Sequence, residues 1–380
     1  MPASRRTFLR TAGAGSLGYF ALAHLNSATA QSSGPSATVE PAAAGVTVRY
    51  LGKQFLDNHV NVTGADGATS FVLPDGNALW VFGDTVEGPF ESIHGLDLAP
   101  LRSNTAAVVP PQDASDGVRN FRFLATNDNK RPRQIIPFAE DEDPAKTRLW
   151  AIHGATIGSN VYLFYHRISL LAGVDVFENF RLEGMGVARA DAAALDFTRL
   201  AFRDGSKELW KLDQPTFGVW VEKTDDYVYL WGSLMTGVFL ARVPPKQIEQ
   251  LDQYEYLTKA PTLKNPTSEV QWSRRFEPSA MLFDSVPNEM SAAYNPHLKR
   301  HLAIHALGRD GQIVMRTAPR RTGPWSEPQV IYDVKRRKPT DMVYAAKEHP
   351  ELARDGGRRM YVTFVNSASY IPELIEVRLP

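Results

Sequence analysis

A short, strongly apolar and often aromatic run occurs five times along the chain, each time after a turn signal, and this repetition constrains the fold more than any other feature. Turn residues followed by aromatic and β-branched residues are typical of β-hairpins. Internal repetition of such a unit indicates an array of equivalent elements. The runs occupy residues 79–83, 161–165, 228–232, 301–305 and 360–364.

Each run belongs to a unit of about four predicted strands. A flatter strand precedes the turn, an apolar strand follows the run and often ends near an arginine, and a further short strand closes most units. Successive units are about 70 residues apart. Four-stranded units repeated radially are the blades of a β-propeller, so we predict an all-β, five-bladed β-propeller. A pair of β-sandwiches is the alternative architecture.

The two ends of the folded part fit into one sheet. The last unit has no outer strand of its own before Pro380, and a strand predicted at 47–51 is left over before the first unit. This N-terminal strand would fill the vacancy and close the ring, which removes exposed strand edges. We therefore expect residues 46–380 to form a single propeller domain.

The N-terminus has the order of a secretory signal. Arg5 and Arg6 precede a weakly apolar stretch at 11–25, and small residues at 28–30 precede Gln31. Adjacent arginines indicate the twin-arginine variant. We predict a twin-arginine signal peptide at 1–30, a flexible linker at 31–45 and a periplasmic or secreted protein, with the twin-arginine translocase as a partner during export. No later stretch is apolar for long enough to span a bilayer, so no stable membrane anchor is expected after cleavage.

Charge and cysteine content exclude several classes of site. Removing residues 1–30 takes away three arginines and no acids, which leaves 39 basic and 42 acidic residues. This balance argues against nucleic acid as a partner, because phosphate binding needs a concentrated basic surface. The chain has no cysteine, which excludes disulfides, Cys-ligated metals and thiol chemistry. We predict neither a cofactor nor a metal.

Two acids of the first unit are candidates for chemistry. Asp66 lies between Gly64 and Gly67 at the start of the predicted innermost strand, and Asp84 follows the first aromatic run. If these two strands pair through the turn at 74–77, the two carboxyl groups meet at one end of the blade. Taken singly, Asp66 is also explained as a turn former and Asp84 as a strand-end cap.

The first blade, with Asp66 and the run at 80–85, resembles the DUF-type propeller family that includes bacterial endo-D-arabinanases. The segments at 289–296 and 323–328 resemble its later blades, and the similarity spans nearly all of the mature chain. The resemblance implies a five-bladed propeller that hydrolyses arabinofuranosyl linkages. It also implies Asp66 and Asp84 as the catalytic carboxylates and places Glu289 on the inner strand of the fourth blade.

Glycoside cleavage is consistent with these acids. An inverting hydrolase needs a carboxylic acid to protonate the leaving oxygen and a carboxylate to activate water, roughly 6.5–9.5 Å apart, whereas a retaining pair is about 5–5.5 Å apart. Our hypothesis is the inverting mechanism, with Asp66 as the base and Asp84 or Glu289 as the acid. The substrate would be a polysaccharide or oligosaccharide. A non-catalytic propeller that binds carbohydrate or protein is the alternative, and a hydrolase for another furanoside or a sialidase-like glycan is a third reading.

Several further residues could line the channel and bind sugar. The candidates are His153, His166, His349, Trp220 and Tyr344. A structural role is the commoner one for each histidine, and packing within a blade is the ordinary role of a large aromatic. His301 and His305 bound one predicted strand, where four residues span roughly 13 Å, too far to share a zinc ion.

Overall fold

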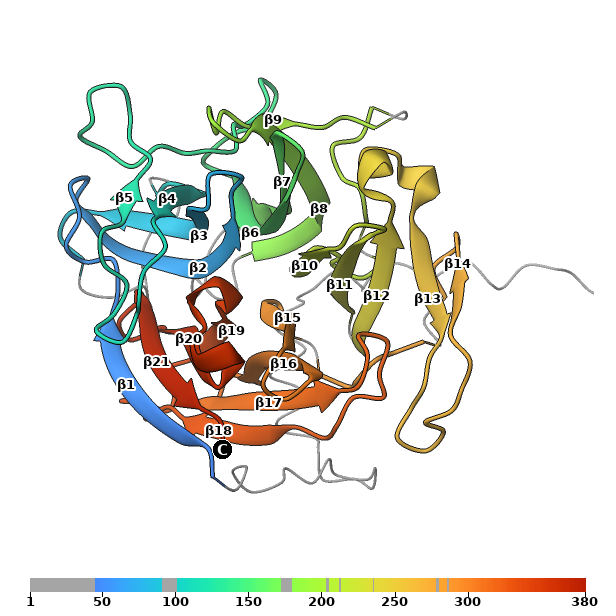
Figure 1. The fold of residues 1–380 in the computed structure, drawn as a ribbon. Helices are drawn as coiled ribbons and strands as arrows, with labels where there is room; N and C mark the ends of the chain where they lie inside the picture. Colours follow the sequence, from blue (N-terminus) through green and yellow to red (C-terminus); the bar gives the residue numbers. More distant parts are fainter. Residues whose placement is uncertain are drawn as a thin grey trace, which may run out of the picture.

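The computed structural model describes residues 45–90, 101–171, 180–202, 205–211, 213–234, 236–277, 280–285 and 287–380. Five antiparallel sheets stand around a common centre, so the predicted five-bladed β-propeller is confirmed (Figure 1). The predicted signal peptide at 1–30 lies outside the described residues, as does the predicted linker apart from Gly45. None of the helices in the described ranges is long and apolar enough to cross a membrane.

The first three blades follow one another along the chain, each starting with its innermost strand. Blade 1 contains β2 (Val62–Val72), β3 (Ala78–Glu87), β4 (Thr105–Val109) and β5 (Arg122–Phe123). Blade 2 contains β6 (Thr147–Ile157), β7 (Asn160–Leu170), β8 (Phe180–Asp191) and β9 (Thr198–Arg199). Blade 3 contains β10 (Trp220–Lys223), β11 (Val228–Leu234), β12 (Gly237–Val243), β13 (Glu255–Lys259) and β14 (Gln271–Ser273).

Blade 4 is followed by a blade built from both ends of the described chain. Blade 4 contains β15 (Met290–Asn295), β16 (Arg300–Leu307), β17 (Gln312–Ala318) and β18 (Gln329–Asp333). Blade 5 contains β19 (Val343–Glu348), β20 (Arg359–Asn366), β21 (Pro372–Arg378) and, outermost, β1 (Thr47–Lys53). The short 3₁₀ helices are η1 (Pro245–Gln247), η2 (Leu251–Gln253), η3 (Pro350–Leu352) and η4 (Asp355–Gly357).

The ring closes through the N-terminal strand, as predicted. β1 pairs antiparallel with β21, with Thr47 opposite Arg378 and Tyr50 opposite Ile375. In Figure 1 the first described strand therefore runs alongside the last one. This pairing covers the edge that β21 would otherwise present to another chain.

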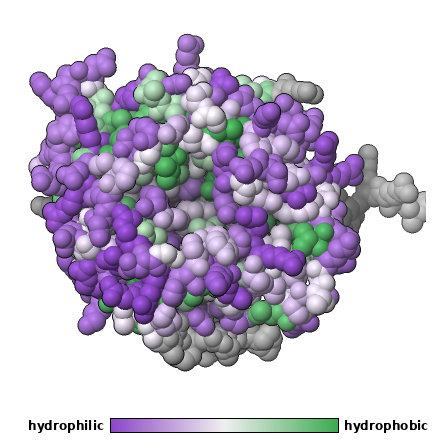
Figure 2. All heavy atoms as spheres, in the orientation of Figure 1, coloured by the Kyte–Doolittle hydropathy of each residue, from purple (hydrophilic) through white to green (hydrophobic). Residues whose placement is uncertain are grey.

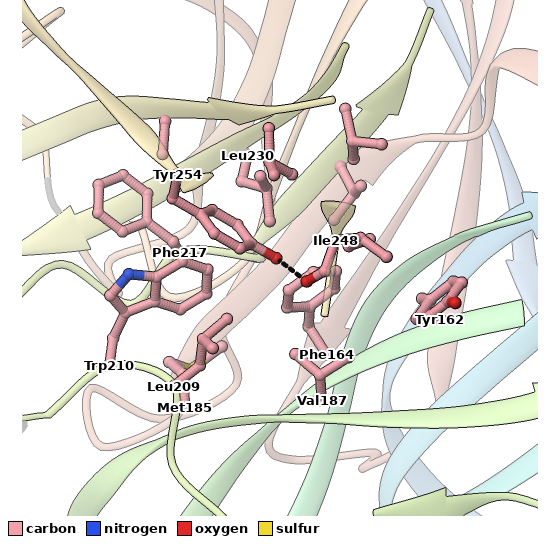
Figure 3. Packing of buried hydrophobic residues seen from close by; sticks show 14 of the residues in the cluster. Tyr162, Phe164, Met185, Val187, Leu209, Trp210, Phe217, Leu230, Ile248 and Tyr254 are labelled. Carbon is pink, nitrogen blue, oxygen red and sulfur yellow. Dashed lines mark hydrogen bonds between the residues drawn. The ribbon is translucent and has the colours of Figure 1, made fainter. Parts of the chain in front are cut away.

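The five aromatic runs are the second strands of the blades because these strands are buried on both faces. β3, for example, is buried at every position from Ala78 to Val86. An apolar cluster fills the space between each pair of consecutive blades. The cluster between blades 2 and 3 packs Trp210 against Phe217 and Tyr254, and the Tyr254 hydroxyl donates a 2.6 Å hydrogen bond to the Ile248 carbonyl oxygen (Figure 3). A strand enclosed in this way needs consecutive apolar residues rather than alternation.

The structure corrects three details of the predicted strands. Blade 3 has a fifth strand, β14, beyond the predicted four. The sequence predicts its inner strand at 217–220, but the strand begins at Trp220, and Phe217 packs in the core beside Trp210. Glu289 does not lie on the inner strand of blade 4 but immediately before it.

Candidate active site

The five innermost strands face one another around the centre of the ring. β2, β6, β10, β15 and β19 each contact the next inner strand, and β19 contacts β2 to complete the circle. The molecular surface is hollowed at this centre (Figure 2). Polar side chains that project from these strands therefore converge on one region, although they are far apart in the sequence.

Asp66 projects from a bulge in β2. Ala65 is paired with Thr85 and Gly67 with Phe82, so Asp66 faces two residues of β3 where the register shifts, and Ala68 is an extra residue of β2 just beyond it. Gly67 and Ala68 follow with positive φ values of 77° and 57°. A bulge of this kind re-aims a side chain at the cost of local strain, and such bulges are over-represented beside active sites. The Asp66 side chain stays partly accessible to solvent.

Asp84 lies on the paired strand β3 and is fully engaged by blade 2. Its Oδ1 atom accepts hydrogen bonds from Arg148, 2.8 Å from Nε and 2.7 Å from an Nη atom, and its Oδ2 atom accepts one of 2.9 Å from Trp150 Nε1. Asp84 and Arg148 are both buried. Burial raises the pKa of Asp84, while Arg148 and the Trp150 indole oppose that rise. The predicted meeting of Asp66 and Asp84 at one end of blade 1 is thus observed.

Two tyrosines from blade 5 contact this acid pair. Tyr344 donates a 3.1 Å hydrogen bond to Asp66 Oδ2, and Tyr370 donates a 3.2 Å bond to the backbone oxygen of Asp84. Burial is the largest cause that raises the pKa of Asp66 well above its ordinary value, followed by the charges of Asp84 and Glu289. The tyrosine hydroxyls lower that pKa but do not reverse the rise. Asp66 is therefore a carboxyl group that keeps its proton when ordinary aspartates have lost theirs.

Glu289 completes the acid cluster from the edge of blade 4. Its Oε1 atom accepts a 2.7 Å hydrogen bond from Lys347 Nζ on β19, and its side chain is 11% exposed. The same ammonium donates a 2.6 Å bond to the carbonyl oxygen of Gly67. The site thus holds a proton-retaining carboxyl, Asp66, close to a carboxylate paired with a cation, Glu289.

The sequence matches the family described as a domain of unknown function (DUF4185) over residues 52–374. The chain belongs to the DUF4185 family. No curated protein matches it. The predicted resemblance to a DUF-type propeller family is confirmed at this level, while arabinanase activity stays a prediction.

Solved structures share the architecture of this DUF4185 chain. A "putative hydrolase" from Bacteroides ovatus is 15% identical with a TM-score of 0.57, covering 90% of this chain and 97% of that one. A GH43_1 enzyme from Xanthomonas citri is 13% identical with a TM-score of 0.48, covering 86% and 89%. A family 117 glycoside hydrolase from Zobellia galactanivorans is 11% identical with a TM-score of 0.45, covering 88% and 90%. The similarity to the Bacteroides ovatus protein shows a shared fold, and the two structures with lower TM-scores support no further conclusion.

The remaining predicted site residues of this DUF4185 chain are buried, apart from Tyr344. His153 lies 4.1 Å from Trp220 between ring centroids, and burial lowers its pKa to about 3. His166 lies on β7 opposite Trp150, and burial lowers its pKa to about 3 as well. Both imidazoles are therefore neutral at physiological pH. Sugar binding by His153, His166 and Trp220 stays a prediction.

His349 is held on both ring nitrogens. Its Nδ1 atom is 2.6 Å from Ser70 Oγ and its Nε2 atom 2.7 Å from Thr363 Oγ1. Its ring stacks on Trp80 at 4.0 Å between centroids. These contacts are those of a residue that joins blades 1 and 5, so we leave His349 out of the site proposed below.

Sequence reasoning missed Arg148, Lys347 and Tyr370. Within the described residues, no group of three or more His, Asp or Glu side chains could hold a metal ion. A usable signal existed for the two cations, because each is a charged residue inside or beside an otherwise apolar inner-strand segment. Tyr370 gave no comparable signal, since it lies in the turn between β20 and β21.

Gly83→Ala is expected to displace Asp66. A Cβ atom at position 83 would lie far inside van der Waals contact with Asp66 Oδ1, so the carboxyl group must move. Overpacking of this kind costs about 1–3 kcal/mol. Chemical denaturation and a crystal structure of the variant would check both effects. Gly76→Ala is the control: its φ of 85° makes the substitution strained, but its Cβ atom would meet no neighbour, so it should cost stability without displacing Asp66.

Glu348→Gln is expected to remove a pH-dependent loss of stability. Burial, with a contribution from Glu351, raises the pKa of Glu348 from 4.5 to about 8. The folded protein therefore binds a proton that the unfolded chain releases, so stability falls as the pH rises from about 4.5 to 8. The variant should match the wild type at pH 4 and exceed it by about 4 kcal/mol at pH 8. Urea denaturation at both pH values measures this, with exposed Glu269→Gln as the control; equal curves for Glu348→Gln and wild type at pH 8 would contradict it.

Proposed function

We propose that this chain is a glycoside hydrolase whose two working carboxyl groups are Asp66 and Glu289. The observation that carries the proposal is the contrast between them within one cluster. Asp66 is enclosed by other acids and keeps its proton, whereas Glu289 accepts a hydrogen bond from a lysine ammonium at 2.7 Å. One carboxyl group that retains a proton, beside a second one held by a cation, is a pair suited to acid–base cleavage of a glycosidic bond.

This contrast changes the role of Asp66, which the sequence led us to expect as the general base. A carboxyl group protonated at neutral pH can donate its proton to the leaving glycosidic oxygen, so Asp66 is the general acid. Glu289, whose Oε1 atom is held by the Lys347 ammonium, is the general base that takes a proton from water. The water oxygen then attacks the anomeric carbon as the bond to the leaving oxygen breaks, which inverts the configuration.

Asp84 supports this chemistry without taking part in proton transfer. Both of its carboxylate oxygens are already bound, to Arg148 and Trp150, and the residue is buried. Its charge contributes to the raised pKa of Asp66. We therefore propose it as a positioning residue rather than as the acid that the sequence suggested.

The proposed substrate is an arabinofuranosyl-containing polysaccharide or oligosaccharide. This finer assignment rests on the sequence resemblance alone, and the acid cluster would serve other glycans equally. The test is incubation of the purified mature protein with a panel that includes arabinan, xylan and galactan. Released oligosaccharides, with the anomer of the first product read by proton NMR, would support the proposal. Binding of a glycan without cleavage would instead favour the non-catalytic propeller.

We also propose that the protein is exported before it acts. The paired Arg5 and Arg6 and the small residues before Gln31 are the basis of this proposal. Replacing both arginines by lysine should retain the protein in the cytoplasm of a host with a twin-arginine translocase. Unchanged export of that variant would count against the pathway, and N-terminal sequencing of the exported protein would locate the cleavage site.

A further inference from the structure

A single buried ammonium joins three segments of the acid cluster. Lys347 belongs to β19 and is 1% exposed. Its Nζ atom donates to the carbonyl oxygen of Gly67 on β2 at 2.6 Å and to Glu289 Oε1, at the edge of blade 4, at 2.7 Å. These two bonds use acceptors from the blades on either side of blade 5.

One acceptor belongs to the residue next to Asp66 in the chain, and the other is the Glu289 carboxylate itself. Gly67 is the residue that follows Asp66, and it belongs to the irregular stretch of β2 in which Gly67 and Ala68 have positive φ values. Glu289 Oε1 lies 3.5 Å from the point where a Cβ atom on Gly67 would stand, so its carboxylate packs over the same bulge. Lys347 therefore bonds the Glu289 carboxylate itself and the backbone of the residue next to Asp66.

Lys347 itself reaches this position through a second bulge. The register of β19 with β20 shifts between Tyr344 and Lys347, and Ala345 within the shift has a φ of 56°. Tyr344, on the other side of this shift, donates to Asp66. The same irregularity thus directs both a hydroxyl and an ammonium of β19 into the cluster.

The buried charge of Lys347 is not explained by a need for folding stability. Burial lowers the pKa of Lys347, and only the nearby acids Glu289 and Asp66 oppose that effect. Replacing a buried ion pair by apolar residues of similar volume is often neutral or stabilising. Packing therefore gives no reason for a lysine here.

We propose that Lys347 is a positioning residue that fixes the Glu289 carboxylate and the Asp66 bulge at the same time, and so sets the geometry between the two. This inference rests on the proposed function. It assigns Lys347 no contact with substrate; it acts through Glu289 and through the backbone of Gly67.

Lys347→Met and Lys347→Arg test the proposal in the full-length mature chain. Methionine keeps the volume and removes the charge, so the rate kcat should fall about 100-fold while KM changes little, because the reacting groups lose their alignment. Arginine keeps the charge but cannot place one nitrogen on both acceptors, so it should restore only part of the rate.

A crystal structure of each variant gives a readout that needs no activity. We expect the Glu289 carboxylate and the 67–68 peptide to shift in Lys347→Met while the five blades superimpose. If both stay in place, or if kcat of Lys347→Met matches wild type, the proposal is overturned. If the wild type cuts no glycan, the proposed function fails, and the structures still decide the positioning role. Glu348→Gln, the adjacent buried substitution, is the control, and Lys347→Arg decides the question if Lys347→Met does not fold.

Discussion

Asp66→Asn is expected to lose at least about 1,000-fold of the hydrolytic rate while the fold becomes more stable at neutral pH. The amide has the shape of the protonated carboxyl group and can accept the hydrogen bond from Tyr344, but it has no proton to donate to the leaving oxygen. A loss of this size is typical when a general acid is removed. The measurement is kcat on the best glycan of the panel.

The raised pKa of Asp66 also predicts whether Asp66→Asn is more or less stable than the wild type. The folded-state pKa of Asp66 is raised well above 3.8, so the folded protein retains a proton that the unfolded chain has released. The resulting loss of folding stability is absent below about pH 4 and grows as the pH rises toward the folded-state pKa. Asp66→Asn should therefore equal the wild type in urea at pH 3.5 and exceed it at pH 7. Asp226→Asn, in an exposed turn, should change neither stability nor rate.

A variant that is both inactive and less stable at pH 7 would point to a structural role for Asp66. Full activity in Asp66→Asn would remove it from catalysis altogether. Because activity and stability are expected to move in opposite directions, the two measurements together separate a catalytic acid from a packing residue.

Arg148→Met is expected to destabilise the fold by about 3–5 kcal/mol, the largest stability effect that we predict for a single substitution. Arg148 is 1% exposed, and besides its bonds to Asp84 it donates a 2.7 Å bond to the carbonyl oxygen of Leu101. Methionine fills the space but leaves the Asp84 carboxylate buried without its cation. Since Asp84 can then escape the penalty by taking up a proton, the loss should shrink as the pH falls from 7.5 to 4.

Two further variants decide whether the ion pair is the cause. Arg148→Met combined with Asp84→Asn should recover most of the lost stability, because no buried charge remains. Arg49→Met removes a cation that is 53% exposed and paired with Glu376, and it should cost less than about 1 kcal/mol. If Arg148→Met and Arg49→Met unfold at the same denaturant concentration, the buried pair between blades 1 and 2 contributes little.

The fold was predictable because its strongest constraint is local in the sequence. The second strand of every blade is covered on both faces by neighbouring blades, so Trp80, Tyr162 and Tyr361 stand in unbroken apolar runs after turn residues. The leftover strand at 47–51 likewise predicted ring closure, since one blade was short of a strand. Departures such as β14 escaped prediction because a short, partly exposed strand has no comparable pattern.

The candidate site was predictable only where hairpin pairing brings its members together. Asp66 and Asp84 lie on adjacent strands of one hairpin, so their proximity followed from the turn between them. Arg148 and Lys347 could not be assigned in this way, because each meets its carboxylate across an interface between blades. The partners are 64 residues apart for Arg148 and Asp84, and 58 for Lys347 and Glu289.

The sequence by itself thus determined the strand pattern, the five blades and the carboxyl groups available for chemistry. Tertiary structure alone decided which of those groups keeps a proton. Protonation depends on burial and on the charges within a few ångströms, and both arise only when inner strands from different blades meet around the channel. The bulges at Asp66 and at Ala345 set these contacts, and neither has a signature in the residue pattern that distinguishes it from a regular strand.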